Sequence, residues 1–166
     1  MSKLDVKIIS ANQRQLPLMH RLASLYRYDL SEFADWPVPA DGDYVYQGLE
    51  DYWLDGYEPL LIVVESQPAG FVILARDEKA DAADYECVEF FIMRKFRGQG
   101  VGEHVALQVF NRYRGRWVIK QLATNTPAIA FWNKIASGYT NNSYDSGIKL
   151  DQEFGEIYLI RFTNNQ

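Results

Sequence analysis

Three glycines at alternate positions carry the clearest chemical signal in this sequence: Gly98, Gly100 and Gly102. An apolar run at residues 86–93 precedes them, and an amphipathic segment from about residue 100 to 113 follows. Glycines between a strand and a helix leave backbone N–H groups uncovered. The first amides of a helix also lack intrahelical partners and lie at the positive end of the helix dipole. The spacing therefore predicts an anion site, and with it a phosphorylated ligand.

Two common phosphate-binding loops do not fit this segment. The dinucleotide fingerprint requires G-x-G-x-x-G, and Glu103 stands where its third glycine should be. The nucleoside-triphosphate loop requires a Gly-Lys pair, and the sequence contains none. Both loops normally come early in a parallel βαβ array, whereas this segment lies past the middle of the 166 residues.

The run Arg97-Gly98-Gln99-Gly100-Val101-Gly102 resembles the acyl-CoA pyrophosphate loop of the GNAT superfamily of N-acetyltransferases. The family pattern is Gln or Arg, two residues, Gly, one residue, then Gly or Ala. It follows an apolar strand whose last residue lies five positions earlier, here Ile92. A second family element is an asparagine before an aromatic helix, and Asn125 with the residues up to Trp132 matches it. The direct resemblance covers about residues 85–138.

The resemblance implies that acetyl-CoA is the co-substrate and that no metal is needed. Backbone groups of the strand end would hold the acyl-pantetheine arm, and amides of the glycine loop would hold the pyrophosphate. The residues expected at the cofactor are Phe90, Phe91, Ile92, Arg97, Gly98, Gln99, Gly100, Val101, Gly102, Glu103, Asn125 and Trp132. Asn125 would bond the arm, although a turn residue before a helix is the alternative reading.

The general acid of the family is not found at its usual place. Many members carry a tyrosine seven residues after the asparagine, and this sequence has Trp132 there. An indole N–H can donate a hydrogen bond but is not an acid at neutral pH. Tyr139, Tyr144 or water would have to serve, or the thiolate leaves unassisted. We expect Phe131 in the core and Trp132 near the cofactor wall, with packing alone as the alternative for both.

Two glutamates of the apolar strand, Glu86 and Glu89, are the candidates for the general base. An unpaired carboxylate in a central strand is costly, so each is either functional or held by a structural ion pair. Strand alternation puts them on opposite faces unless a bulge intervenes. His20 and His104 are weaker candidates.

Residues 28–58 hold nine acids and no Lys or Arg. Eight large aromatic residues lie among them: Tyr28, Phe33, Trp36, Tyr44, Tyr46, Tyr52, Trp53 and Tyr57. The family builds its acceptor site partly from this region, and carboxylates with aromatic faces suit a cationic amine. The resemblance therefore implies a small-molecule or peptide amine acceptor, and a solvated acidic loop is the alternative.

Length and a hydrophobic content of 48% predict one domain over residues 1–166. The resemblance implies a mixed α/β (α+β) GNAT fold: a mostly antiparallel central sheet, splayed fourth and fifth strands, and helices on both faces. Strands are expected near 6–9, 59–65, 71–76, 86–93, 117–122, 139–145 and 154–163. Helices are expected near 15–28, 45–53, 100–113 and 127–136, the last capped by Thr126 and stopped by Gly138.

Composition argues against several other classes. The net charge is −5 and no long Lys/Arg run occurs, which does not favour nucleic-acid binding. No apolar run reaches the roughly 18–20 residues of a membrane span. The single cysteine, Cys87, cannot form an internal disulfide, and we expect a cytoplasmic protein. A homodimer is common in the family. A non-catalytic acyl-CoA-binding sensor or interaction module is the alternative to an N-acetyltransferase.

Overall fold

The structure, a computed structural model, describes residues 4–165. Its strands are β1 (Val6–Ser10), β2 (Tyr57–Val64), β3 (Gln67–Arg76), β4 (Tyr85–Ile92), β5 (Arg116–Leu122), β6 (Asp145–Asp151) and β7 (Gly155–Thr163). The α-helices are α1 (Leu16–Leu30), α2 (Val101–Arg112) and α3 (Thr126–Thr140). Short 3₁₀ helices are η1 (Gln13–Gln15), η2 (Leu49–Trp53), η3 (Asp77–Lys79) and η4 (Arg94–Phe96).

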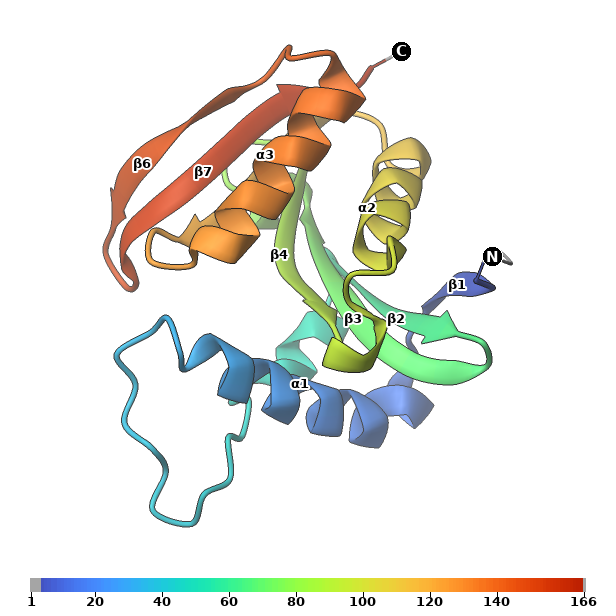
Figure 1. Ribbon diagram of the computed structural model, residues 1–166, viewed down its shortest axis with the longest axis vertical. Coiled ribbons are helices and arrows are strands. Elements are labelled where there is room, and N and C mark those ends of the chain that lie inside the picture. Colours follow the sequence, from blue (N-terminus) through green and yellow to red (C-terminus); the bar gives the residue numbers. More distant parts are fainter. Residues whose placement is uncertain (1–3, 166) are drawn as a thin grey trace.

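The strands form one seven-stranded sheet in the order β1-β2-β3-β4-β5-β7-β6. Every neighbouring pair is antiparallel except β4 and β5. Helices α2 and α3 cover one face and α1 covers the other (Figure 1). This confirms the expected fold class. No helix among residues 4–165 is long and apolar enough to cross a bilayer.

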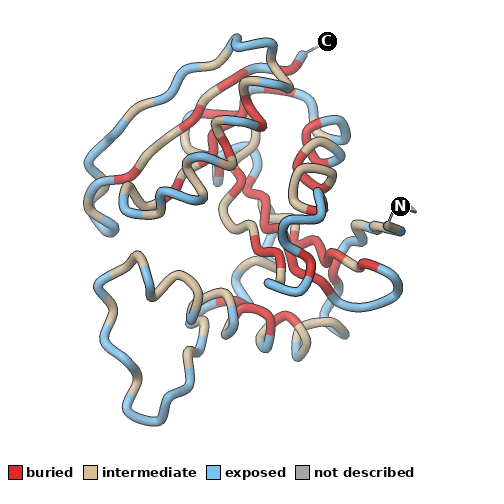
Figure 2. Tube along the Cα trace, viewed as in Figure 1, coloured by how far each residue is buried: buried red, intermediate tan, exposed pale blue. Residues whose placement is uncertain are grey.

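Each face of the sheet has its own core. The buried residues lie mainly along the central strands and on parts of the helices that cover them (Figure 2). Under α2 and α3 the core includes Val105, Phe110 and Trp117. Under α1 it includes Met19 and Phe71. Strand alternation sends successive side chains to opposite faces, so the middle of the sheet is apolar on both sides.

Strands β4 and β5 part soon after they meet. They pair only at Tyr85 with Trp117, Glu86 with Val118 and Cys87 with Ile119. Beyond these three pairs the sheet is open between them, as expected for the splayed fourth and fifth strands. The open end of this gap lies between α1 and the N-terminal ends of α2 and α3 (Figure 1).

A β-bulge in β4 changes which side chains share a face. Ile73 of β3 pairs with Glu89 and the next residue pairs with Cys87, so Val88 is the extra residue. Cys87 and Phe90 both pack into the core under α2 and α3, although they are three residues apart. Glu86 and Glu89, which precede them, therefore both turn to the opposite face, which strict alternation would forbid.

Two element boundaries differ from those expected. The β2–β3 turn is Glu65-Ser66, with φ of 49° and 61°, so β3 starts at Gln67 rather than near residue 71. Two residues with positive φ form the tight hairpin turn that matches strand twist. Helix α3 continues through Gly138 to Thr140 and ends at left-handed Asn141, so the next strand starts at Asp145 rather than near 139. A helical glycine costs only about 1 kcal/mol, which is too little to stop a packed helix.

Candidate functional site

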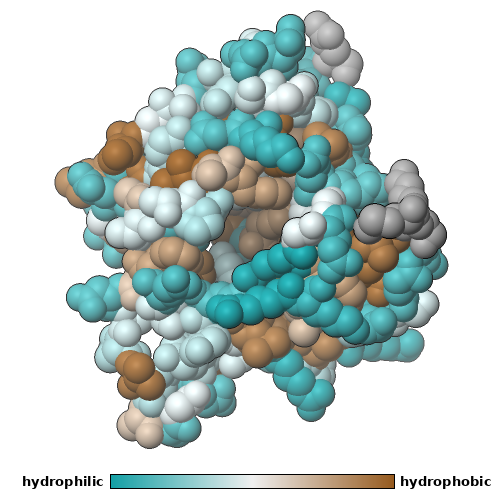
Figure 3. Space-filling view, in the orientation of Figure 1, coloured by the Kyte–Doolittle hydropathy of each residue, from teal (hydrophilic) through white to brown (hydrophobic). Residues whose placement is uncertain are grey.

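A cavity of about 770 Å³ opens where β4 ends. Its walls come from the C-terminal half of α1, the end of β4, the glycine loop, the start of α2 and the first half of α3. The surface is hollowed near the centre of Figure 3, between these elements. Most predicted cofactor residues line it: Phe90, Phe91, Ile92, Arg97, Gly98, Gly100, Gly102, Glu103, Asn125 and Trp132.

The glycine loop has the backbone of an anion cradle. Gly98 and Gly100 adopt φ of +71° and +78°, and a Cβ on either would meet no atom within 4 Å. Gly100 is the N-cap of α2 and supplies no side-chain cap, so the first α2 amides keep unused donors beside the cavity. A Cβ on Gly102 would lie 3.3 Å from the Phe131 ring, so a small residue there lets α2 and α3 approach.

Val101 and Gln99, the other two predicted cofactor residues of the loop, have side chains that point away from the cavity wall. Val101 is buried in the core, and the Gln99 side chain donates to the Lys95 carbonyl at 2.7 Å. Neither side chain is part of the cavity wall. Their main-chain amides remain available for the role that we expected of them.

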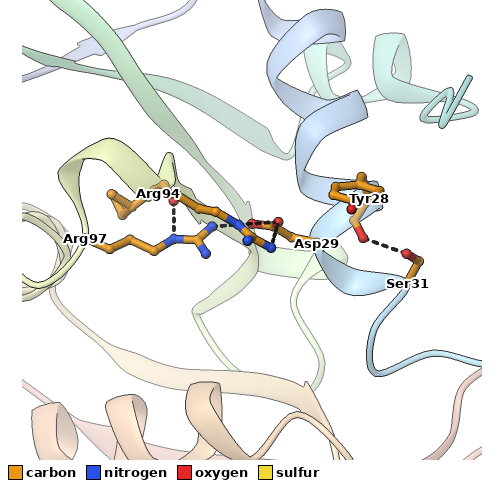
Figure 4. A network of polar contacts seen from close by, with 6 residues as sticks. Tyr28, Asp29, Ser31, Arg94 and Arg97 are labelled. Atoms are coloured by element: carbon orange, nitrogen blue, oxygen red, sulfur yellow. Dashed lines mark hydrogen bonds and ion pairs between the residues drawn. The ribbon is translucent and has the colours of Figure 1, made fainter.

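An ion-pair network joins α1 to the loop (Figure 4). Asp29 accepts hydrogen bonds from Arg94 Nη2 at 2.8 Å and Nε at 3.1 Å, and it also pairs with Arg97. Arg97 Nε donates to the Ile92 carbonyl at 2.7 Å, which ties the loop to the end of β4. Sequence reasoning missed Asp29, because the carboxylate and the loop are more than 60 residues apart.

Asn125 and Trp132 both lie at the cavity, each with a structural partner as well. Asn125, rather than Thr126, caps α3, and its Oδ1 accepts from Ala128 N at 3.2 Å. Trp132 is only 5% exposed and packs edge-on against Phe90, with ring centres 4.8 Å apart. Trp132 is thus more deeply buried than Phe131, and both form cavity wall, so Phe131 is not the core residue that we expected.

Glu89 lies in a cluster of tyrosines under the α1 face of the sheet. Tyr46 donates a hydrogen bond to Glu89 Oε1, Tyr52 approaches the same oxygen at 3.4 Å, and the two hydroxyls are 2.8 Å apart. Burial raises the pKa of the Glu89 carboxyl, while the hydroxyls of Tyr26, Tyr46 and Tyr52 oppose the rise. Burial and the nearby carboxylate raise the pKa of Tyr46 and Tyr52. Glu89 itself is not part of the cavity wall, but Tyr26 is, so this cluster adjoins the cavity.

The other two predicted catalytic residues are held elsewhere. Glu86 pairs with Lys120 at 3.0 Å and accepts from Asp81 N at 3.0 Å. Tyr139 donates to Asn111 at 3.1 Å and packs on Phe110. Neither belongs to the cavity wall. The structure thus does not bring Glu86 or Tyr139 to the cavity. Glu86 is held by Lys120 and the Asp81 amide, and Tyr139 lies near the C-terminal end of α3, away from the cavity.

The remaining candidates also have local partners. Tyr144 donates to Asn133 Oδ1 at 3.1 Å. His20 contacts Glu50 at 2.8 Å, and His104 contacts Gln108 at 2.7 Å. Within residues 4–165, no group of three or more His, Cys, Asp or Glu side chains could hold a metal ion.

Comparison with known proteins gives one family. The model of the acetyltransferase (GNAT) family matches residues 22–137. No curated protein matches the sequence. An acetyltransferase from Thermus thermophilus has a TM-score of 0.69 at 18% identity, over 98% of this chain and 99% of that one. The ribosomal-protein-S18-alanine N-acetyltransferase from Escherichia coli has a TM-score of 0.63 at 13% sequence identity, over 98% of this chain and 96% of that one.

A third structure was solved with a ligand. It is a putative streptothricin acetyltransferase from Bacillus anthracis in complex with acetyl coenzyme A, with a TM-score of 0.51 at 13% identity, over 72% of this chain and 69% of that one. At sequence identities this low, structural similarity is evidence for a shared fold and not for a shared substrate. The family model spans well over half of the sequence, and its match includes both the glycine loop and Asn125. The chain therefore belongs to the GNAT family of acetyltransferases and is an acyltransferase enzyme.

Proposed function

We propose that this protein binds acetyl-CoA in the cavity at the end of β4 and transfers the acetyl group to a primary amine. One observation carries the proposal: uncapped helix-start amides face a large cavity at the open end of a splayed strand pair. The Bacillus anthracis structure contains acetyl coenzyme A on a similar fold.

The donor groups of the cavity suit the ligand. The amides after Gly98 and Gly100 would hold the pyrophosphate, since a helix N-terminus favours negative charge. Arg94 and Arg97 lie beside the loop, and each keeps N–H donors beyond those that pair with Asp29. Phe90, Phe131 and Trp132 supply an apolar wall for the acyl-pantetheine arm. When bound, acetyl-CoA supplies an activated thioester.

Glu89 is the base that the geometry favours. The attacking amine must lose a proton, and a base works best when its pKa lies near the working pH. Burial raises the pKa of Glu89 in that direction. Tyr26 connects the two regions, because it lines the cavity and its hydroxyl stabilises the Glu89 carboxylate. Trp132 can orient the ligand by packing or by its N–H but cannot donate a proton at neutral pH.

The acceptor is proposed to be a cationic small molecule or a protein or peptide amine. A second hollow of about 300 Å³ includes Ser24, Asp43 and Tyr46, and Tyr46 is also a partner of Glu89. The hollow therefore leads toward the base, and its wall contains Arg21 and His20 as well as Asp43. Arg27 lies 4.4 Å from the Trp36 ring centre and 5.8 Å from that of Tyr46, so part of this aromatic surface already holds a cation. The Escherichia coli relative is named for acetylating an alanine of a ribosomal protein.

Thiol release from acetyl-CoA with a panel of amines tests the proposal. The panel should contain polyamines, aminoglycosides, and peptides with free N-termini. We expect thiol release with at least one cationic amine and loss of that release in Glu89→Gln. Tight binding of acetyl-CoA with no release for any amine would instead support the non-catalytic module, which the tryptophan at the acid position favours.

A further inference from the structure

The side chain of Gln121 is buried without a protein partner. Its exposed fraction is 8%. Neither Nε2 nor Oε1 hydrogen-bonds to any other residue of the described chain, 4–165. No other side chain of that part has buried polar atoms left unpaired in this way. A buried polar group without a partner is destabilising, so a carboxamide at this position calls for an explanation.

Gln121 lies on β5 at the place where β5 has separated from β4. Strand β5 pairs with β7 without a register shift, so Gln121 shares a face with Ile119, which packs under α2 and α3. Ile119 is the last residue of β5 paired to β4, opposite Cys87. Gln121 is therefore the first β5 side chain on this face beyond the point where the strands part.

Phe90 holds the corresponding place on β4. The bulge at Val88 makes Phe90 the next side chain after Cys87 on the same face. Phe90 lines the cavity. Gln121 and Phe90 thus occupy equivalent places on the two sides of the gap. Phe90 forms part of the cavity wall, whereas Gln121 is covered and does not.

Helix α3 covers this part of the gap. The cross-strand neighbour of Gln121 is Tyr158 of β7, whose hydroxyl bonds to Asn133 of α3 at 3.0 Å. Trp132, next to Asn133, also lines the cavity. The unpaired carboxamide therefore lies beneath the stretch of α3 that forms the cavity wall.

We propose that Gln121 is a cofactor-binding residue, and that its carboxamide pairs with an amide of the acyl-pantetheine arm. This inference rests on the proposed function. A carboxamide offers both a donor and an acceptor, and both are unpaired here. An amide of the arm offers the complementary acceptor and donor, whereas the thioester offers only an acceptor. To reach the covered carboxamide the arm would have to enter between β4 and β5 beyond the present cavity wall. A reciprocal pair of hydrogen bonds would then fix its depth.

Calorimetric titration of two ligands tests the assignment. CoA carries the arm, and adenosine 3′,5′-bisphosphate carries the adenosine, the 3′-phosphate and one phosphate of the pyrophosphate without it. We expect Gln121→Leu to raise the Kd of CoA roughly tenfold, since two neutral hydrogen bonds are lost, and to leave the Kd of adenosine 3′,5′-bisphosphate unchanged. Its thermal midpoint should equal or exceed that of the wild type, because two unpaired polar atoms are removed.

Tyr158→Phe is the matched control at the neighbouring position. It removes the hydroxyl that bonds to Asn133 but no group of the proposed pair, so it should lower the thermal midpoint and leave the Kd of CoA unchanged. Gln121→Met replaces Gln121→Leu if the branched variant does not fold. In wild-type protein the Gln121 side-chain amide resonances should shift with CoA and not with adenosine 3′,5′-bisphosphate.

Three results would overturn the assignment. An unchanged CoA affinity in Gln121→Leu would show that water or nothing pairs with the amide. An equal loss of affinity for both ligands would show a general distortion of the site. Failure of the wild type to bind CoA would overturn the proposed function itself, and this assignment with it.

Discussion

Glu89 combines burial, three neighbouring tyrosine hydroxyls and a place next to the cavity wall. If it is the general base, Glu89→Gln should lower kcat by about 10²- to 10⁴-fold with little change in acetyl-CoA affinity. Glu86→Gln on the same face of β4 is the matched control. It should keep its activity and lose about 1–3 kcal/mol of unfolding free energy, because Lys120 loses a charged partner. Equal activity in both variants would contradict the assignment.

The pH dependence follows from the same carboxyl. The pKa of Glu89 is raised by burial, so the base form is lost as the pH falls through that raised pKa. We expect kcat/KM to rise with pH on an acidic limb whose midpoint lies above the usual glutamate value of about 4.3. The limb should be missing from the residual activity of Glu89→Gln. A pH profile with the same limb in both proteins would exclude Glu89 as its origin.

The pH dependence of the unfolding free energy should also report Glu89. Its raised pKa acts in the opposite direction to the lowered pKa of other acids in the protein. The folded state holds the Glu89 proton more tightly than the unfolded state, so this group removes stability as the pH rises from its unfolded pKa through its folded pKa. Asp81 and Asp84 have lowered pKa values, and their contribution is lost as the pH falls. Urea unfolding should therefore show Glu89→Gln gaining stability relative to wild type as the pH rises through that window. A constant difference would contradict the raised pKa.

Single residues were predictable from the sequence only where a local pattern defines them. Gly100, Asn125 and Ile92 belong to short motifs, so their places at the cavity followed directly. Asp29 and Tyr46 reach their partners across more than 40 residues of chain. No spacing rule joins such positions, and only the fold brings them together.

Among the elements, two glycines should respond to alanine in opposite ways. Gly138 is exposed inside α3 and a Cβ there would meet nothing within 4 Å, so Gly138→Ala should stabilise the protein by about 0.5–1 kcal/mol. Gly70 lies on β3, and a Cβ there would come within 1.9 Å of the Phe91 carbonyl oxygen. Gly70→Ala should destabilise by about 3 kcal/mol or more. Chemical unfolding checks both, and similar effects would contradict the described packing.

The element order was predictable from hydrophobic periodicity, but some element ends were not. The β4 bulge inserts one residue without any glycine or proline to announce it, and it decides that Glu86 and Glu89 share a face. Helix α3 passes its glycine because Ile135, Ala136 and Tyr139 pack on both sides of that position. Tertiary packing outweighs a local stop signal of about 1 kcal/mol.

At the scale of the whole molecule, acidic residues gather in segment 28–58, whereas Arg94 and Arg97 lie beside the glycine loop that would receive the phosphates. The long connection from α1 to η2 leaves the body of the fold beside α1 (Figure 1). Asp41, Asp43 and Asp51 are exposed, so their reversal should cost little stability. Changing all three to lysine should raise the KM of a cationic acceptor several-fold, and less at high salt, while acetyl-CoA affinity stays the same. Unchanged acceptor kinetics would contradict an acidic approach to the site.

The most direct measurement is calorimetric titration of acetyl-CoA into the wild type, Gly100→Glu and Gly42→Glu. The two glycines form a matched pair, with φ of +78° and +76° and no atom within 4 Å of an added Cβ. Only Gly100 lies at the cavity and caps α2. We predict that Gly100→Glu abolishes binding while the domain stays folded, and that Gly42→Glu binds like the wild type. Retained affinity in folded Gly100→Glu would contradict acyl-CoA binding at this loop.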